Sequence, residues 1–310
     1  MNSLSDAMPD APPGTSAMGR PALPAGAKPY YWSLRRELWE NRSLYIAPLV
    51  VAALVLIGVF MGALRLSERF GAIRVEPAKE AAVTAIPYAT AAIAIIVTGF
   101  IVGAFYCLGA LHNERRDRSI LFWKSMPVSD VTAVLTKAAI PLFVLPAVLF
   151  AVVVVTQLVM LLFDTLVLAP SGVGVARLWA QWPLVRTSVV LAYGLITLSL
   201  WYAPIWGWLL MVSAWAKRAP FLWAVLPPLA VCLVESLALG TGSFARLLGW
   251  RLSGAFDTAF SGAIPGTAIV DLQQIDPARF FGSLDLWTGL AAAAAFLAAA
   301  VWLRRSRDLS

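Results

Sequence analysis

The chain has 310 residues, of which 60% are hydrophobic and 13% are charged, and its formal net charge is +7. Soluble domains are about 45–50% apolar and about 25% charged, and a soluble surface as apolar as this one would aggregate. The composition therefore excludes soluble, disordered and disulfide-framework proteins and indicates an integral membrane protein. It does not favour nucleic acid as a partner, because excess Lys and Arg in a membrane protein reflect topology and contact with anionic lipid.

Side chains for metal or redox chemistry are scarce. His112 is the single histidine, and Cys107 and Cys232 lie far apart, each within an apolar run. A multi-histidine metal site or a CxxC motif cannot be built from these residues. We therefore expect no metal site and no cofactor, and we expect both cysteines to behave as small buried hydrophobes.

The chain begins with residues 1–29, which contain six prolines and no apolar run. This composition predicts a disordered tail and no secretory signal. Residues 30–43 predict a short amphipathic helix with Tyr31, Leu34 and Leu38 on one face and Glu37 on the opposite side. Such a helix either lies in the plane of the lipid headgroups or extends the first span onto the membrane surface.

The rest of the chain, residues 30–310, is expected to form one transmembrane domain. A helix needs about 20 residues to cross about 30 Å of hydrocarbon. Six apolar runs meet or approach this length, at about 44–64, 86–111, 138–163, 188–215, 221–241 and 286–303.

An even number of spans places both termini on the same side of the membrane. With cytoplasmic termini, the inside segments carry 15 of the 24 lysines and arginines and the outside segments carry 9. The positive-inside rule therefore favours cytoplasmic termini. The outside loop 242–285 mixes apolar residues with arginines, which is typical of an interfacial helix.

The densest charge in the chain follows the second span, in the sequence HNERRDRSILFWKSMPVSD over residues 112–130. This segment is typical of a short helix that docks into a groove on a soluble partner. It combines the charged residues 114–118 with the aromatic Phe122 and Trp123, and the helix-breaking Pro127 follows. Ser129 and Asp130 can cap a helix that leads into span three. The alternative is that the charges only fix topology while the apolar residues lie in the membrane surface.

Motifs for intrinsic catalysis are missing from the sequence. It has no GxxxxGK[ST] phosphate loop, no GxSxG and no HExxH pattern. We therefore expect the chain not to be an enzyme by itself, and any dependence on ATP must come from a partner.

The loop between spans two and three resembles the permease subunits of type-2 ATP-binding cassette (ABC-2) transporters. The resemblance lies in the acidic-basic pair Glu114-Arg115, the turn Pro127-Val128-Ser129 and the downstream Lys137. The amphipathic helix before span one, the six spans and the long outside segment before span six agree with the same family. The resemblance covers most of the chain in its organisation, and about 25 positions in its residues.

The resemblance implies that two permease subunits, identical or different, pair with two separate ATPase subunits. The loop would form a coupling helix seated in a cleft of the ATPase, so that closure of the ATPase dimer on ATP tilts the spans. The residues assigned to this coupling are Glu114, Arg115, Arg116, Asp117, Arg118, Phe122, Trp123 and Pro127.

Two residues within the spans are candidates for a substrate path. Glu235 is the one carboxylate well inside a predicted span, where an ionisable group is costly and marks a functional hypothesis. Pro227-Pro228 precede it and are expected to kink or break the helix. A structural hydrogen bond is the alternative for Glu235. Trp201 lies in a tryptophan stripe on span four, which indicates either packing or a lateral gate.

We therefore expect an all-α polytopic protein of the inner membrane that acts as the permease subunit of an ATP-driven exporter. One rival interpretation is a membrane scaffold or regulatory subunit without a transport path. Another is an ion-coupled secondary transporter, which usually carries several intramembrane charges or paired broken helices. The sequence does not identify the transported substrate.

Overall fold

The computed structural model describes residues 29–67, 77–116, 129–168, 179, 183–261 and 272–306. These residues are helical throughout, apart from short connections and one isolated bridge between Phe260 and Ile275. Within them, six helical segments are long and apolar enough to cross a membrane, which confirms an all-α protein with six candidate spans. The predicted tail 1–29 lies outside the described residues except for Pro29.

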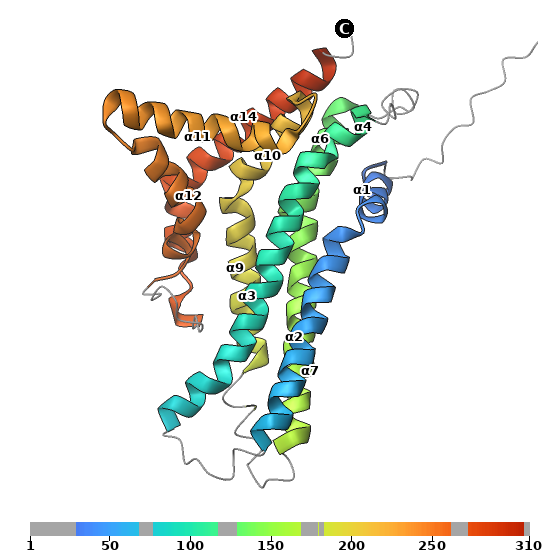
Figure 1. Cartoon of the computed structure of the whole chain (residues 1–310), viewed down its shortest axis with the longest axis vertical. Helices are drawn as coiled ribbons and strands as arrows, with labels where there is room; N and C mark the ends of the chain where they lie inside the picture. The colour runs from blue at the N-terminus through green and yellow to red at the C-terminus, as the bar shows by residue number, and fades with distance from the viewer. Residues whose placement is uncertain are drawn as a thin grey trace, which may run out of the picture.

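The elements follow one another along the chain as shown in Figure 1. The first half contains α1 (Pro29–Glu40), α2 (Ser43–Ser67), α3 (Pro77–Ala110), α4 (His112–Arg116), α6 (Asp130–Ala139), the π-helix η1 (Ile140–Val144) and α7 (Leu145–Leu168). The second half contains α9 (Leu184–Trp201), α10 (Ala203–Trp215), α11 (Pro220–Leu239), α12 (Ser243–Ala259), the 3-10 helix η3 (Leu272–Gln274), α13 (Pro277–Gly282) and α14 (Leu284–Ser306).

Helices α2, α3 and α7 run side by side and form the first part of the bundle (Figure 1). Gly99 and Gly103 of α3 allow close approach to the third span, because a Cβ atom at Gly99 would lie 2.4 Å from Leu149 Cδ2 and one at Gly103 would lie 2.7 Å from Leu145 Cδ2. These two small residues thus serve the packing of α3 against the third span within the chain.

The third span is continuous from Asp130 to Val167 and begins earlier than the predicted 138–163. Ser129 is its N-cap, and the Ser129 side chain accepts a hydrogen bond from the Thr132 amide at 3.2 Å. The capping role expected at this position is therefore confirmed.

The predicted span 188–215 is divided into two helices, so one uninterrupted helix over this range is wrong. Helix α9 ends at Trp201, and Pro204 stands in the first turn of α10, where a missing amide hydrogen is tolerated. Helix α10 then packs along α14. Gly207 permits this contact, since a Cβ atom there would lie 3.1 Å from the Ala293 carbonyl oxygen.

Helix α11 is unbroken although it contains Pro227 and Pro228, so the expected break is absent. Proline cannot donate to the carbonyl four residues earlier, which for Pro228 is that of Ala224. The indole Nε1 of Trp208 in α10 donates to this carbonyl oxygen at 3.0 Å. A neighbouring helix therefore satisfies the acceptor that the proline leaves free.

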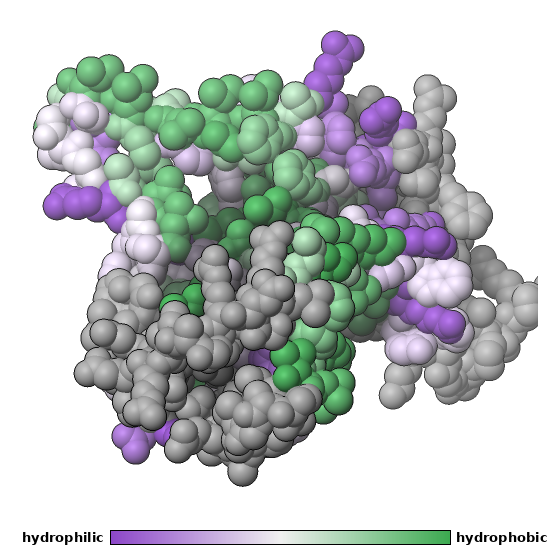
Figure 2. All heavy atoms as spheres, turned by 60° about the horizontal axis from the view of Figure 1, so that its bottom comes forward, coloured by the Kyte–Doolittle hydropathy of each residue, from purple (hydrophilic) through white to green (hydrophobic). Residues whose placement is uncertain are grey.

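Helix α11 also differs from the other spans in its placement. In Figure 1 it runs across the long axes of α2, α3 and α7, and α12 turns back from its far end. Only 6% of the most apolar stretch of α11 is buried within the chain, whereas 44% of the corresponding stretch of the third span is buried. Hydrophobic residues dominate its surface (Figure 2).

Candidate functional site

A buried ion-pair cluster joins four helices at one end of the bundle. Its centre is Lys137 of α6, whose Nζ lies 2.6 Å from Glu37 Oε1 of α1 and 3.0 Å from Glu114 Oε1 of α4. The side chain of Lys137 is 5% exposed, and those of Glu37 and Glu114 are 13% and 16% exposed. Two carboxylates from separate helices therefore share one largely desolvated ammonium group.

Helix α14 enters the same cluster through Arg304. The Nη1 atom of Arg304 lies 2.8 Å from Glu114 Oε2, and its Nε lies 3.0 Å from Asp130 Oδ1. Asp130 is the first residue of α6 and also lies 4.0 Å from Arg305 Nε. We define the ion-pair cluster as Glu37, Glu114, Asp130, Lys137 and Arg304.

Neutral donors complete the hydrogen bonding of Glu37. The hydroxyl of Tyr106 in α3, a residue with 5% exposure, donates to Glu37 Oε2 at 3.0 Å. Asn41 Nδ2 donates to the Glu37 carbonyl oxygen at 3.0 Å. Buried charges are tolerated when they are paired and hydrogen-bonded, and such groups fix how elements meet more than they add net stability. Here the elements so fixed are α1, α3, α4, α6 and α14.

A second set of contacts, all hydrogen bonds, joins the start of α4 to the end of α10. The buried hydroxyl of Ser213 accepts hydrogen bonds from the Leu111 and His112 amides, each at 3.0 Å, and donates to the Leu108 carbonyl oxygen at 2.8 Å. The Arg115 guanidinium donates to the carbonyl oxygens of Ser213 and Ala216. These bonds satisfy backbone groups at the junction of α3 and α4.

The residues assigned to ATPase coupling separate into three groups. Glu114 and Arg115 bind other helices of the same chain through the contacts just described. Arg116 is exposed at the end of α4. Asp117, Arg118, Phe122, Trp123 and Pro127 lie outside the described residues.

Sequence reasoning missed the parts of the cluster contributed by Glu37 and Arg304. Glu37 was expected opposite the apolar face of its helix, whereas the structure turns it inward beside Leu34 and Leu38, which pack against the core. A signal was available, because residues three and four apart share one helical face and an acidic residue between two leucines points to a buried partner. Arg304 gave no comparable signal, because basic residues commonly end a last span.

Glu235, a candidate for the substrate path, caps the N-terminus of α12. Its Oε1 atom accepts hydrogen bonds from Thr241 Oγ1 at 2.8 Å and from the Ser243 amide at 2.7 Å. Its Oε2 atom accepts one from the Phe244 amide at 2.8 Å. The carboxylate thereby satisfies amide groups that a helix N-terminus leaves without partners.

Trp201, the other candidate for the path, is fully buried. Its Nε1 donates to the Arg251 carbonyl oxygen at 2.8 Å, and the Arg251 guanidinium lies 4.6 Å from the centre of its ring. Burial lowers the pKa of Arg251 below its ordinary value, and the negative charge of Asp285 opposes this shift. Trp201 thus holds α12 against the junction of α9 and α10 and lines neither of the two grooves described below.

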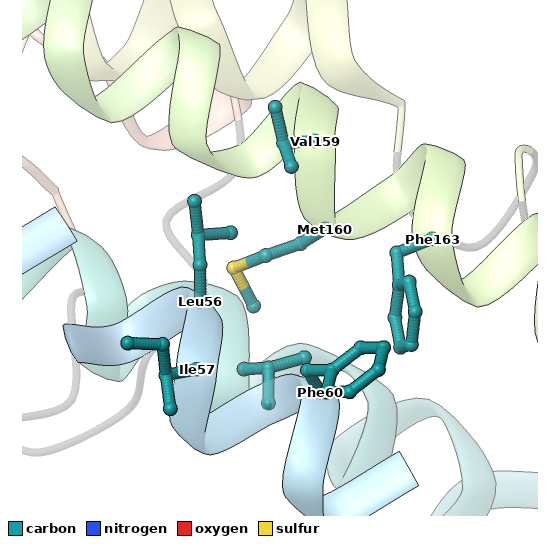
Figure 3. Close-up of a pocket in the computed structure, with 7 residues that line it drawn as sticks. Leu56, Ile57, Phe60, Val159, Met160 and Phe163 are labelled. Carbon is teal, nitrogen blue, oxygen red and sulfur yellow. The ribbon is translucent and has the colours of Figure 1, made fainter. Parts of the chain in front are cut away.

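The structure contains an apolar groove between α2 and α7, with a volume of about 280 Å³ (Figure 3). Leu56, Ile57 and Phe60 face Val159, Met160 and Phe163 across it. Phe60 and Phe163 pack with their ring centroids 4.9 Å apart. The groove offers no polar group that could orient a ligand.

A second groove of about 670 Å³ lies between α11 and α12 and includes Glu235. Among the described residues, no group of three or more His, Cys, Asp or Glu side chains is arranged to hold a metal ion.

Comparison with protein-family models, curated proteins and solved structures finds no match to this chain.

Proposed function

We propose that this chain is the transmembrane permease subunit of an ABC-2 type exporter and works with separate ATPase subunits. The observation that carries the proposal is that the ion-pair cluster holds both sides of the segment 117–128. Glu114 precedes this segment and Asp130 and Lys137 follow it, and all three belong to the same cluster. The six candidate spans and the ABC-2-like Glu114-Arg115 and Lys137 support the same function.

In the proposed mechanism, an ATPase subunit binds segment 117–128 and the exposed Arg116. Force applied there reaches α4 and α6 directly, because these helices flank the segment. The cluster passes it to α1 through Glu37 and to α14 through Arg304. Charged contacts at low exposure resist separation, since parting them leaves a buried charge without its partner. The helices would therefore tilt together when the ATPase dimer closes.

The proposal assigns ATP hydrolysis to the partner and no catalysis or cofactor to this chain. It places a pair of such chains, identical or different, in the inner membrane with the termini on the ATPase side. A scaffold subunit would share the cluster but would support no transport, so assays need both ATP hydrolysis and substrate movement.

The test uses the tagged full-length chain, purified from its native membrane together with any P-loop ATPase subunit that elutes with it. Combining Arg116→Glu with Trp123→Ala should abolish permease-stimulated ATP hydrolysis and leave membrane insertion intact. Among the described residues Arg116 is exposed and forms no ion pair with the cluster, so Arg116→Glu leaves the cluster's own contacts in place. Arg218→Glu, at an exposed position after α10, serves as the matched control and should keep stimulation. Unchanged stimulation in the double variant would overturn the coupling assignment.

A further inference from the structure

The groove between α11 and α12 combines apolar walls with one charged group. Val231, Val234 and Leu239 of α11 face Phe244 and Leu247 of α12 across a volume of about 670 Å³. Ligand sites of about 300–1,000 Å³ typically have predominantly apolar walls and a small number of polar groups that fix orientation. Glu235 is the one ionisable residue in the lining of this groove.

Glu235 has no ionic partner within the described part of the chain, although the N-terminus of α12 offsets part of its charge. Its three hydrogen bonds come from neutral donors, namely one hydroxyl and two backbone amides. No described lysine or arginine forms an ion pair with it, and the nearby Arg246 donates instead to Ser243 Oγ at 3.3 Å. An ionised carboxylate has about four acceptor positions, so one stays available after these three bonds.

We propose that this groove binds a monocationic amphiphile, with its ammonium group at Glu235 and its alkyl chain along Val231, Val234 and Leu247. Charge complementarity selects the head, because a cation adds the charge-assisted contact that the neutral donors do not supply. An anionic head would be repelled by the carboxylate, and a neutral head would gain no such contact. The apolar walls accept the chain, since burying apolar surface is favourable roughly in proportion to its area. The proposal rests on the proposed function and names the class of exported substrate.

Binding is tested on the purified full-length chain without any ATPase, in nanodiscs of phosphatidylcholine. The probe is radiolabelled dodecyltrimethylammonium, and empty nanodiscs give the partitioning background. Saturable binding is expected, whereas dodecyl maltoside, which has the same chain length and a neutral head, should bind at least about tenfold more weakly. Absence of saturable binding, or equal binding of both probes, would overturn the proposal.

Three variants assign the binding to this groove. Glu235→Gln removes the charge and should weaken binding about tenfold or more, the range expected for losing a charge-assisted contact. Thr241→Val removes one hydrogen bond to Glu235 but keeps the charge, and should bind within about twofold of the wild type. Ala230→Trp fills the groove without touching the charge and should abolish binding. Should Glu235→Gln fail to fold, Ala230→Trp still decides, because unchanged binding there would overturn the assignment.

This experiment separates the two proposals. Saturable binding without a copurifying ATPase would contradict the proposed function alone. Stimulated ATP hydrolysis without saturable binding would contradict the substrate class alone.

Discussion

Lys137 is the residue on which the ion-pair cluster depends most directly. It stands between Glu37 and Glu114, with its Nζ 2.6 Å from the first carboxylate and 3.0 Å from the second. Arg304 also pairs with Glu114, whereas Glu37 has no second cationic partner among the described residues. The lysine therefore decides whether α1 can be held against α6.

We expect Lys137→Met to destabilise the protein by about 3–5 kcal/mol, the cost of removing one partner of a buried ion pair. The methionine keeps most of the side-chain volume, so the loss reports the missing charge. Unfolding by SDS in mixed micelles, followed by circular dichroism, measures the change. Adding Glu37→Gln to this variant should recover part of the loss, because the uncompensated carboxylate is then removed as well.

Lys217→Met is the matched control, since Lys217 is exposed after the end of α10. It should change the free energy of unfolding by no more than about 0.5 kcal/mol. Equal effects of the two substitutions would show that the cluster does not stabilise the fold.

At the scale of single residues, the sequence predicted chemical character better than partners. The dense charge around Glu114 and the downstream Lys137 could be seen in the sequence. That the two residues form an ion pair between α4 and α6 could not be seen there. Glu37 comes from a third helix, about 100 residues away from Lys137 in sequence. Periodicity reports which face of a helix is apolar, and it carries no information about which distant helix supplies a counter-charge.

At the scale of elements, apolar length predicted the spans well and their interruptions poorly. The prolines of α11 leave its helix unbroken, and Trp208 donates to the Ala224 carbonyl oxygen that Pro228 leaves free, whereas span four divides at Tyr202 near Pro204. A proline removes the same amide in each case. The donor that Trp208 provides for the Ala224 carbonyl comes from a neighbouring helix, so it is a property of the packed structure and not of the span's own sequence.

The glycines of α3 give a prediction for how elements pack. We expect Gly99→Val to destabilise the protein by about 1–3 kcal/mol more than Gly58→Val, the range typical of overpacking a core. A Cβ atom at Gly99 would meet the buried Leu149, whereas one at Gly58 in α2 has nothing within 4 Å. Both substitutions change helix propensity equally, so their difference measures the clash. Unfolding in mixed micelles provides the comparison, and equal losses would contradict the packing of α3 on the third span.

At the scale of the whole molecule, the cluster gathers the first and last described helices at one end. Glu37 of α1 pairs with Lys137 of α6, and Arg304 of α14 pairs with Glu114 of α4 and Asp130 of α6. Figure 1 places these four elements together. The far end of the bundle is formed by the end of α2, the beginning of α3, the end of α7 and the beginning of α9 (Figure 1). The helices are joined at that end too, since the Tyr88 hydroxyl of α3 donates to Asp164 Oδ2 of α7 at 2.6 Å and Phe60 of α2 packs against Phe163 of α7.

This arrangement predicts which residues share a side of the membrane. In a background of Cys107→Ala and Cys232→Ala, single cysteines replace Arg35, Arg305 or Val185, all of which are exposed. In sealed inside-out vesicles, a membrane-impermeant maleimide should label the first two positions and should reach position 185 only after permeabilisation. Right-side-out vesicles should give the reverse pattern, because the charge bias of the loops predicts that the cluster faces the cytoplasm. Labelling of positions 185 and 305 from the same side would contradict the topology, and opposite labelling of positions 35 and 305 would contradict the cluster itself.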